Sequence, residues 1–295
     1  MNSFKLIECP RDAMQGLADF IPTEDKIRYL NALLRVGFDT LDFGSFVSAK
    51  AIPQLSDTAE VLAGLDLTET RTELLAIVAN LRGAEQAVLY PEIQYLGFPL
   101  SVSETFQLRN TNKTITQAFA EVEAIQQLCV THQKQLVVYL SMGFGNPYGD
   151  PYSPEIVGQF TERLVRSGIA IIAPSDTIGS STPEAIETLF GHLLRTFPTI
   201  EFGAHLHSRP EQVAEKVQAA LRAGVQRIDG ALQGLGGCPM ASDALTGNLP
   251  TEQITYLIKK EGISLHINQN RLAEALVLSS EILGSRTHGP AGGPV

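Results

Sequence analysis

Short apolar runs alternate along the chain with segments in which apolar residues recur every three or four positions. The apolar runs, which are typical of buried strands, lie at residues 5–9, 40–43, 74–78, 93–96, 136–140, 169–173, 200–204 and 225–229. The periodic segments between them predict amphipathic helices. Ser153-Pro154 and Thr182-Pro183, for example, have the cap and proline that often begin a helix. The chain is therefore predicted to repeat a strand-then-helix unit.

About eight such units follow one another, which favours a closed parallel (β/α)8 barrel, an α/β fold of the TIM type. An open doubly wound sheet is the alternative, but no glycine-rich nucleotide-binding fingerprint follows the first strand. Residues 251–283 predict further helices, which would form a C-terminal cap over the mouth of the barrel. We expect one catalytic domain over residues 1–283 and a disordered tail, rich in Gly and Pro, over 284–295.

The composition narrows the class of protein. Of the 295 residues, 44% are hydrophobic, which is ample for a large core, and the net charge is −10. This acidity argues against broad binding to nucleic acid or to an anionic membrane. No apolar run reaches the ~18 residues needed to span a bilayer, and the N-terminus lacks a signal-peptide pattern, so a cytoplasmic protein is expected.

In a barrel of this type, reactive groups lie where strands end and the following loops begin. Polar residues occur at these points of the sequence: Arg11 and Asp12 after the first strand, Asp42 at the end of the second, Asp176 after the sixth, His205 and His207 at the end of the seventh, and Cys238 after the eighth. This agreement is the main support, from the residues alone, for an enzyme.

His205 and His207 are two positions apart on a predicted strand, so both imidazoles face the same side. They could be unrelated histidines, one of them hydrogen-bonded in the core. With Asp12 and Asn248 they make a set of two nitrogens, a carboxylate and an amide oxygen, which predicts a divalent-metal site. Mg²⁺ or Mn²⁺ suits such a mixed, fairly hard set, and Zn²⁺ is less favoured.

Cys238 follows two glycines and precedes a proline, in a loop that would expose its thiol. A thiol with a pKa of ~8.5 can donate a proton near neutral pH. A free cysteine is more often a small buried apolar residue, as we expect for Cys9 and Cys129. Because the three cysteines are an odd and scattered set, no disulfide framework is predicted.

Arg11 and Asp12 could form a surface pair, but at a strand end we expect them to diverge. Asp12 would then reach the metal, and Arg11 would stabilise an oxygen that carries developing negative charge. Asp42 and Asp176 are expected to orient water or the metal ligands. Either aspartate could instead be a helix cap, and Asp176 could form a turn.

These motifs resemble the hydroxymethylglutaryl-CoA lyase family, within the metal-dependent Claisen-type lyases and synthases on a TIM barrel. The resemblance covers about residues 4 to 283. The matching segments are Pro10-Arg11-Asp12 with Gln15, Ser45 to Lys50 with Pro53-Gln54, Ser175 to Gly179, Ala204 to His207, and Gly234 to Pro239 with Gly247-Asn248. The glycine-cysteine loop is specific to the lyase side of the group.

The resemblance implies a retro-Claisen cleavage in which a 3-hydroxy-3-methylglutaryl thioester yields acetyl-CoA and acetoacetate. The family's metal ligands would be Asp12, His205, His207 and Asn248 here. Arg11 would stabilise the acetyl-CoA enolate and Cys238 would protonate it. The general base would be His205 or an aspartate such as Asp176. The implied partner is an acyl-CoA substrate, and we expect a homo-oligomer, with a dimer as the simplest case.

The chain departs from the family pattern around the substrate. Asp42 is one methylene shorter than the family's glutamate, and Val137 replaces an arginine on the fifth strand. Ser208-Arg209 follow the second histidine, where the family has an acidic or amide residue and threonine. Because the metal ligands are spared, the hypothesis is that the chemistry is retained while the acyl group differs.

Three alternatives remain at this point. The first is a synthase that condenses acetyl-CoA with a 2-keto acid, although such enzymes usually carry extra C-terminal segments. The second is a pyruvate-type aldolase on the same fold, which would not need the Cys238 loop. The third is a metal-binding barrel that has lost turnover, which the changes at Asp42 and Val137 make worth considering.

Overall fold

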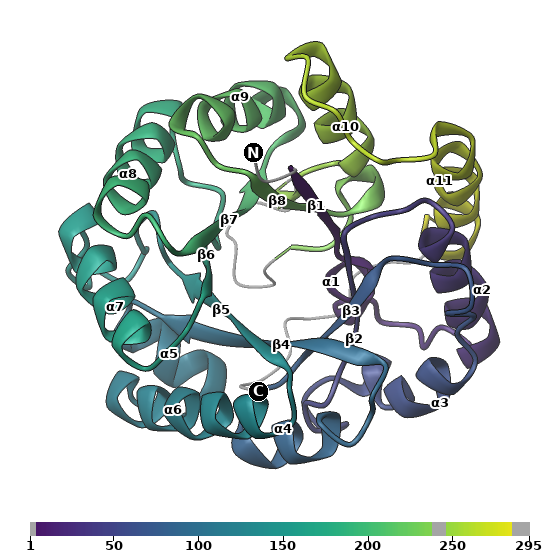
Figure 1. The fold of residues 1–295 in the computed structure, drawn as a ribbon, viewed down its shortest axis with the longest axis horizontal. Coiled ribbons are helices and arrows are strands. Elements are labelled where there is room, and N and C mark those ends of the chain that lie inside the picture. The colour runs from purple at the N-terminus through teal and green to yellow at the C-terminus, as the bar shows by residue number, and fades with distance from the viewer. Residues whose placement is uncertain (1–3, 238–245, 285–295) are drawn as a thin grey trace.

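The computed structural model describes residues 4–237 and 246–284, and these form a ring of helices around a ring of strands (Figure 1). The strands are β1 Lys5–Glu8, β2 Thr40–Ser45, β3 Glu73–Ile77, β4 Ile93–Ser101, β5 Gln135–Ser141, β6 Ile171–Asp176, β7 Glu201–Ser208, β8 Arg227–Gly230 and the short β9 Gly247–Asn248. Each predicted apolar run lies in or overlaps a strand. The runs are too short in places: β2 continues past Phe43 to Ser45, and β7 continues past Ala204 to include both histidines.

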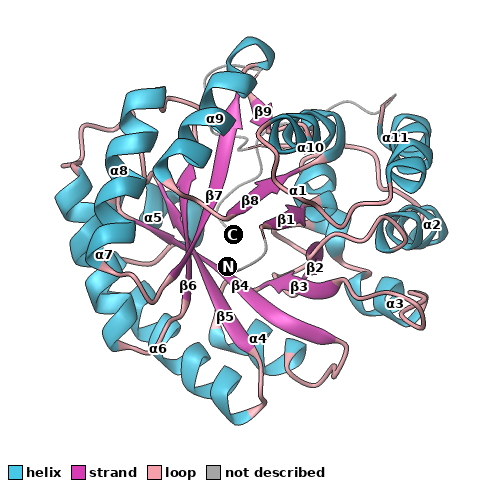
Figure 2. Cartoon of the chain, turned by 45° about the horizontal axis from the view of Figure 1, so that its top comes forward, coloured by secondary structure: helices cyan, strands magenta, loops and turns pink. Residues whose placement is uncertain are grey.

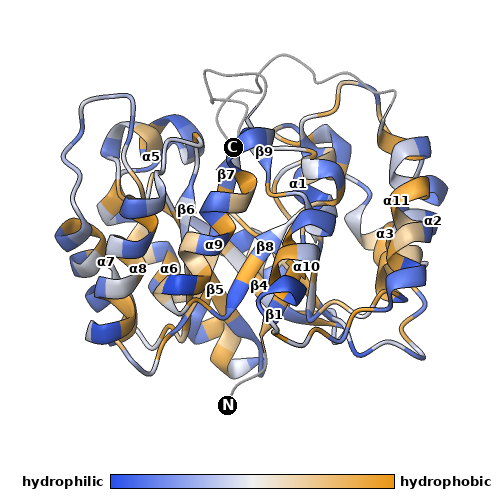
Figure 3. Cartoon of the chain, turned by 90° about the horizontal axis from the view of Figure 1, so that it is seen from above, coloured by the Kyte–Doolittle hydropathy of each residue, from blue (hydrophilic) through white to orange (hydrophobic). Residues whose placement is uncertain are grey.

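The strands β1 to β8 pair in parallel with their neighbours, and β6 also pairs with β7, so that the sheet closes into a barrel. Figure 2 shows the strands inside and the helices outside. This confirms the TIM-barrel prediction and excludes the open doubly wound sheet. The strand β9 pairs antiparallel with the end of β7 at the upper end of the barrel in Figure 3, which is the carboxyl end of the parallel strands.

The helices are α1 Pro10–Gln15, α2 Thr23–Leu34, α3 Thr58–Ala63, α4 Leu81–Ala87, α5 Glu104–Thr111, α6 Ile115–Thr131, α7 Pro154–Arg166, α8 Pro183–Thr196, α9 Val213–Ala223, α10 Thr251–Lys260 and α11 Gln269–Leu283. Their ends follow the local signals. The hydroxyls of Ser153 and Thr182 accept hydrogen bonds from backbone amides in the first turns of α7 and α8. Gly224 ends α9 in the left-handed conformation, with a φ of 94°.

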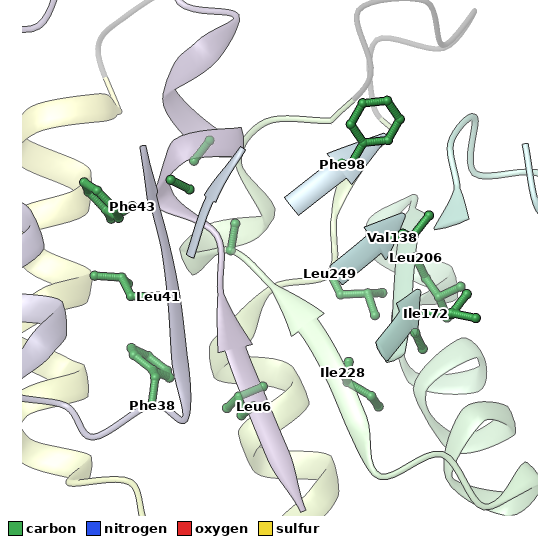
Figure 4. Close-up of a cluster of buried hydrophobic side chains, with 14 of the residues drawn as sticks. Leu6, Phe38, Leu41, Phe43, Phe98, Val138, Ile172, Leu206, Ile228 and Leu249 are labelled. Atoms are coloured by element: carbon green, nitrogen blue, oxygen red, sulfur yellow. The ribbon is translucent and has the colours of Figure 1, made fainter. Parts of the chain in front are cut away.

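The main core lies between the barrel and the helices. Side chains on the outward faces of the strands form it, including Leu6, Leu41, Phe43, Val138 and Ile228 (Figure 4). Inward-facing side chains alternate with these along each strand. Apolar residues from β3 to β6 fill one side of the interior: Leu75, Ile77, Tyr95, Val137, Tyr139, Ile171 and Ala173. The interior positions of β1, β2, β7 and β8 carry most of the polar side chains discussed below.

The two C-terminal helices are present, but they lie in the outer ring and not over the mouth (Figure 1). There α10 packs beside α9, and α11 packs beside α2. The apolar residues of α10 and α11, such as Ile254, Ile258 and Leu272, are buried in the main core. This placement covers the outer faces of β8 and β1, which a ring ending at α9 would leave exposed.

The single-domain limits of 1–283 stay a prediction, and the predicted tail lies outside the described residues apart from Gly284. In the part of the chain that the structure describes, no helix has the length and apolar character needed to cross a bilayer.

Glu8 is a fully buried carboxyl group on the outward face of β1. It accepts a hydrogen bond from the backbone amide of Leu232 at 2.9 Å and another from the hydroxyl of Thr251. Burial raises the pKa of Glu8 to about 8, more than these hydrogen bonds lower it. The group therefore links β1 to the segment after β8, and it is mostly protonated at neutral pH.

We predict that Glu8→Gln makes the protein less sensitive to alkaline pH. The native pKa of Glu8 lies above that of the unfolded chain, so its contribution to stability is full below about pH 4.5 and is lost as the pH rises toward 8. Glutamine mimics the protonated acid and has no such loss. Urea unfolding across this pH interval should show that the free energy of unfolding of the variant, relative to that of the wild type, increases with pH. The increase should reach a few kcal/mol at the alkaline end. Parallel pH profiles would contradict the assignment.

Candidate metal centre at the mouth of the barrel

Two histidines of β7 face the barrel interior near its carboxyl end. His205 and His207 are two positions apart on the strand, as predicted, and their ring centroids are 5.3 Å apart. The register of β9 places Asn248 directly opposite His207. The short strand thus brings an amide side chain next to the histidines, although Asn248 follows them by some forty residues in the sequence.

Asp12 joins the two histidines from α1, which begins directly after β1. One donor atom from each of Asp12, His205 and His207 lies within 4.8 Å of the other two. The Nδ1 atom of His207 contacts the carbonyl oxygen of Thr177 at 3.0 Å, while its buried Nε2 atom has no hydrogen-bond partner among the described residues. This arrangement fits a metal ion, because a buried nitrogen lone pair without a hydrogen bond is a ready ligand.

Asp12 is held as a carboxylate by its neighbours. Its oxygens accept hydrogen bonds from Arg11 at 2.8 Å, from Gln15 at 2.7 Å and from the Asn248 amide at 2.7 Å. Burial alone would raise the pKa of Asp12, but the Arg11 guanidinium, the histidines and Asn248 outweigh it and lower the pKa to about 2. Asp12 is therefore ionised, as a metal ligand must be.

Arg11 is buried between two carboxylates. Its Nε and Nη2 atoms donate to Asp42 at distances of 2.5 to 3.2 Å, and its Nη1 atom donates to Asp12. The expectation that Arg11 and Asp12 diverge is therefore wrong, because the planar guanidinium reaches both acids at once. Burial raises the pKa of Asp42 to about 6 even though Arg11 lowers it. Asp42 lies inside β2, where its side chain orients Arg11.

His205 is oriented by Asp229, an inward-facing residue of β8. The Nδ1 atom of His205 lies 3.1 Å from a carboxylate oxygen of Asp229, and the Tyr139 ring packs edge-on against the imidazole at 5.4 Å between centroids. Burial would lower the pKa of His205, but the hydrogen bond to Asp229 and its charge raise it above the ordinary value. With Nδ1 turned to Asp229, the other ring nitrogen is directed toward the metal centre.

Asp176 does not join this group. On β6 the neighbouring Ser175 pairs with His205 and faces the interior, so Asp176 faces outward. Its carboxylate accepts hydrogen bonds from Ser180, from Ser181 and from Lys216, which lies on α9 and donates at 2.8 Å. All of its contacts shape the loop between β6 and α8. Asp176 therefore supports the mouth from outside the barrel wall.

Cys238, the predicted proton donor, lies outside the described residues, but the chain that leads to it can be followed. Gly236 has a φ of +82°, and a Cβ atom built there would lie 2.5 Å from the Asp12 carbonyl oxygen. The carbonyl oxygen of Leu235 accepts a hydrogen bond from Asn248 at 2.8 Å. Only glycine allows the loop to pass this close to α1. The loop therefore leaves the described structure at the metal centre.

Several residues of the site were not singled out from the sequence. They are Asp229, Tyr139, Lys216 and Arg227, together with Cys9, which forms a compact donor group with His205 and Asp229. Strand periodicity could have indicated Asp229, because it lies at the end of β8 and has the parity of the interior. Arg227, two positions earlier on β8, has the same parity, whereas the position of Lys216 on α9 carries no such signal.

Comparison with known proteins agrees with this geometry. The family model described as HMGL-like matches residues 5–278. The chain is 33% identical to hydroxymethylglutaryl-CoA lyase YngG of Bacillus subtilis over 93% of this chain and 91% of that protein. It is 31% identical to the human mitochondrial hydroxymethylglutaryl-CoA lyase, over 96% of this chain and 86% of that protein.

Solved structures give the same result. The Bacillus subtilis HMG-CoA lyase superposes with a TM-score of 0.90 at 32% identity, covering 96% of this chain and 95% of that one. An HMG-CoA lyase from Acinetobacter baumannii, solved with coenzyme A and 3-methylmalate, has a TM-score of 0.87 at 30% identity, covering 99% and 93% of the two chains. The carboxyl transferase domain of Rhizobium etli pyruvate carboxylase, at 17% identity, shares the fold alone.

Proposed function

The chain belongs to the HMGL-like family, and from this premise we propose that it is a divalent-metal-dependent carbon–carbon lyase. Its substrate is 3-hydroxy-3-methylglutaryl-CoA or a related 3-hydroxyacyl-CoA, which it cleaves to acetyl-CoA and a keto acid. The observation that carries the proposal is the meeting of Asp12, His205 and His207 at the mouth of the barrel, with the Arg11 guanidinium bonded to Asp12.

Mg²⁺ or Mn²⁺ is the proposed ion, and Asp12, His205, His207 and Asn248 are its proposed ligands. The donor set of a carboxylate, two imidazoles and an amide suits either ion, and the low pKa of Asp12 supplies the negative charge. When bound, the ion acts as a Lewis acid that lowers the pKa of the substrate's tertiary hydroxyl.

Arg11 and Cys238 are proposed to act on the products of bond cleavage. The tertiary hydroxyl gives its proton to a general base, for which His205 is the candidate that faces the interior. As the bond between C2 and C3 of the acyl group breaks, its electron pair moves into the thioester as an enolate, and C3 becomes the carbonyl carbon of the keto acid. Arg11 is proposed to stabilise the enolate oxygen, because Asp42 and Asp12 hold its guanidinium in place. Cys238 then donates the proton that C2 needs to become the methyl group of acetyl-CoA.

The aspartates Asp42 and Asp176 are proposed to act indirectly. Asp42 orients Arg11 through paired hydrogen bonds, and Asp176 anchors the loop after β6 together with Lys216. The carboxylate of Asp176 is fully engaged on the outer side of the barrel wall, which is unfavourable for a general base.

We further propose that the protein is a homodimer and that it is located in the cytoplasm. Gel filtration with light scattering would test the oligomeric state, and cell fractionation would test the location.

The test of this proposal is the release of acetyl-CoA from 3-hydroxy-3-methylglutaryl-CoA. After treatment with a chelator, we expect no release, and we expect added Mg²⁺ or Mn²⁺ to restore it. Release that persists after complete removal of metal would contradict the metal-dependent mechanism. Calorimetry with each ion, run in parallel, separates loss of the metal site from loss of turnover.

A related acyl group is the second candidate substrate, favoured by two departures from the family pattern. Asp42 is short and wholly engaged with Arg11, and the interior position of β5 is the apolar Val137. A series of 3-hydroxyacyl-CoA thioesters, compared by kcat/KM, distinguishes the two candidates. A parallel assay supplies acetyl-CoA and a 2-keto acid. If the protein condenses these two compounds, it is a synthase.

A further inference from the structure

Arg227 is an unusual residue for the interior of a barrel. It is the first residue of β8, it faces inward beside Lys5 of β1 and Gly203 of β7, and only 1% of it is exposed. Arginine is almost never fully buried unless it is paired. The metal centre lies further along the barrel axis, at the ends of the same strands, and none of the proposed ligands contacts Arg227.

The space for Arg227 is provided by Gly203. A Cβ atom at Gly203 would lie 3.0 Å from Cδ of Arg227 and 3.3 Å from its Cγ and Nε atoms. Contacts this short are tighter than most Cβ contacts in proteins, so a side chain at this point of β7 would require Arg227 to shift by a few tenths of an ångström. The small residue on one strand and the long residue on the next therefore form a matched pair inside the barrel.

The known partner of Arg227 uses only one of its nitrogens. Nη1 donates to Glu201 at 3.0 Å, and Glu201 also accepts a hydrogen bond from Lys5 at 2.6 Å. The Nε and Nη2 atoms of Arg227 are buried and have no partner among the described residues. The ion pair with Glu201, at the lower end of the barrel, therefore uses the Nη1 atom of Arg227. The other two nitrogens are free to donate to other groups in the interior.

Besides the Nε2 atom of His207, two other buried polar atoms of the interior are without a partner in the described chain: the Tyr139 hydroxyl and the Oδ1 atom of Asp229. Burial raises the pKa of Tyr139 most, the Asp229 carboxylate raises it further, and the Arg227 guanidinium lowers it. Asp229 is also the largest charge that raises the pKa of Arg227. Arg227 and Asp229 are two positions apart on the inward face of β8, and Asp229 and Tyr139 both contact the ring of His205, so the three side chains share one part of the interior, with two N–H donors, one acceptor and one hydroxyl.

Buried polar groups are almost always hydrogen-bonded, and ordered water serves where protein groups do not meet directly. Two to four polar partners are enough to hold a buried water, and this region offers four such atoms. Tyr139 and Asp229 are also the two residues that hold the ring of His205, by edge-on packing and by the 3.1 Å contact to Nδ1.

We propose that Arg227 is a positioning residue, whose guanidinium, through ordered water shared with Tyr139, holds the Asp229 carboxylate against Nδ1 of His205. The orientation of His205, and hence the nitrogen that it turns to the metal, then depends on a charge at the lower end of the barrel. The Arg227–Gly203 pair belongs to this function. The inference rests on the proposed metal centre but not on the identity of the acyl substrate.

The test compares Arg227→Met with Glu201→Gln. Methionine keeps the length of the side chain and removes its charge and donors, whereas glutamine removes the charge that Arg227 meets at the lower end of the barrel. Because partners behind a metal ligand commonly contribute 10- to 100-fold to metal affinity, we expect Arg227→Met to weaken Mn²⁺ binding to the chelated protein by roughly 10-fold. Calorimetry or electron paramagnetic resonance measures this, and Glu201→Gln should stay near the wild type.

A second readout needs neither metal nor substrate. In the metal-free protein, at a pH high enough for His205 to be neutral, its ¹⁵N NMR signals should show the proton on Nδ1 in the wild type and in Glu201→Gln, and a mixture of tautomers in Arg227→Met. Equal Mn²⁺ affinity and an unchanged tautomer in Arg227→Met would overturn the inference. If Arg227→Met changes the tautomer but the wild type shows no lyase turnover, the result contradicts the proposed function and supports the role of Arg227.

If Arg227→Met does not fold, the structure of the wild-type protein provides the test. A high-resolution crystal structure should show ordered water within hydrogen-bond distance of Asp229 Oδ1 and of the Arg227 guanidinium or the Tyr139 hydroxyl. Density that shows no water between these groups would overturn the inference.

Discussion

Replacing Arg11 with methionine is expected to lower kcat for lyase turnover by about 10³-fold or more. The loss of one preorganised donor at an oxyanion commonly costs 10²- to 10³-fold, and here the same guanidinium also holds Asp12 in place. The variant should also lose stability, by roughly 3–5 kcal/mol, because two buried carboxylates lose the charge between them. Steady-state kinetics and urea unfolding measure the two effects.

Two further variants separate catalysis from stability. The double variant Arg11→Met with Asp42→Asn removes one of the two buried carboxylates that lose their partner in Arg11→Met. It should therefore recover much of the stability and none of the turnover. Arg11→Lys keeps a positive charge but cannot make the paired contacts to Asp42, and it should recover turnover only in part. If the double variant regained turnover along with stability, Arg11 would be a structural residue only.

Replacing Cys238 with alanine is expected to lower turnover by about 10²- to 10⁴-fold while leaving metal binding unchanged. This is the range that a positioned proton donor contributes. The metal affinity should persist because the proposed ligands lie on α1, β7 and β9, outside the loop that carries the thiol. Calorimetry with Mn²⁺ and acetyl-CoA release from the same preparation provide the two measurements.

Cys129→Ala is the matched control for the thiol. Cys129 is buried on the outer helix α6, and burial raises its pKa to about 12, so it has no part in proton transfer near neutral pH. Its replacement should leave turnover close to the wild type. Normal turnover in Cys238→Ala would show that another group protonates the enolate and would remove Cys238 from the mechanism.

The fold of this protein could be predicted from the sequence because its helices and its strands are both specified by residues that lie close together in the chain. The two-residue period of β7 placed His205 and His207 on one face before any tertiary contact was known. Hydroxyl caps and prolines marked the starts of α7 and α8 because they satisfy backbone amides within the same turn. The resemblance to a known family added the reaction and its substrate.

The sequence alone could not determine which polar residues meet. Asp12 and Asn248 are joined by a hydrogen bond across 236 positions, and only barrel closure with β9 brings them together. Asp42 and Asp176 looked equivalent, yet one faces inward to Arg11 and the other faces outward to Lys216. The parity of each strand decides this, and a strand boundary misplaced by one residue reverses the expected side.

The amino-acid sequence by itself determined the alternation of strands and helices, the shared face of the two histidines and the residue types of the candidate metal site. The tertiary structure alone decided that Arg11 bridges Asp12 and Asp42, that α10 and α11 complete the outer ring, and that Arg227 fits inside the barrel against Gly203. The physical reason is range. Periodicity and capping act within a few residues, whereas ion pairing and packing depend on distances that exist only when the barrel has closed.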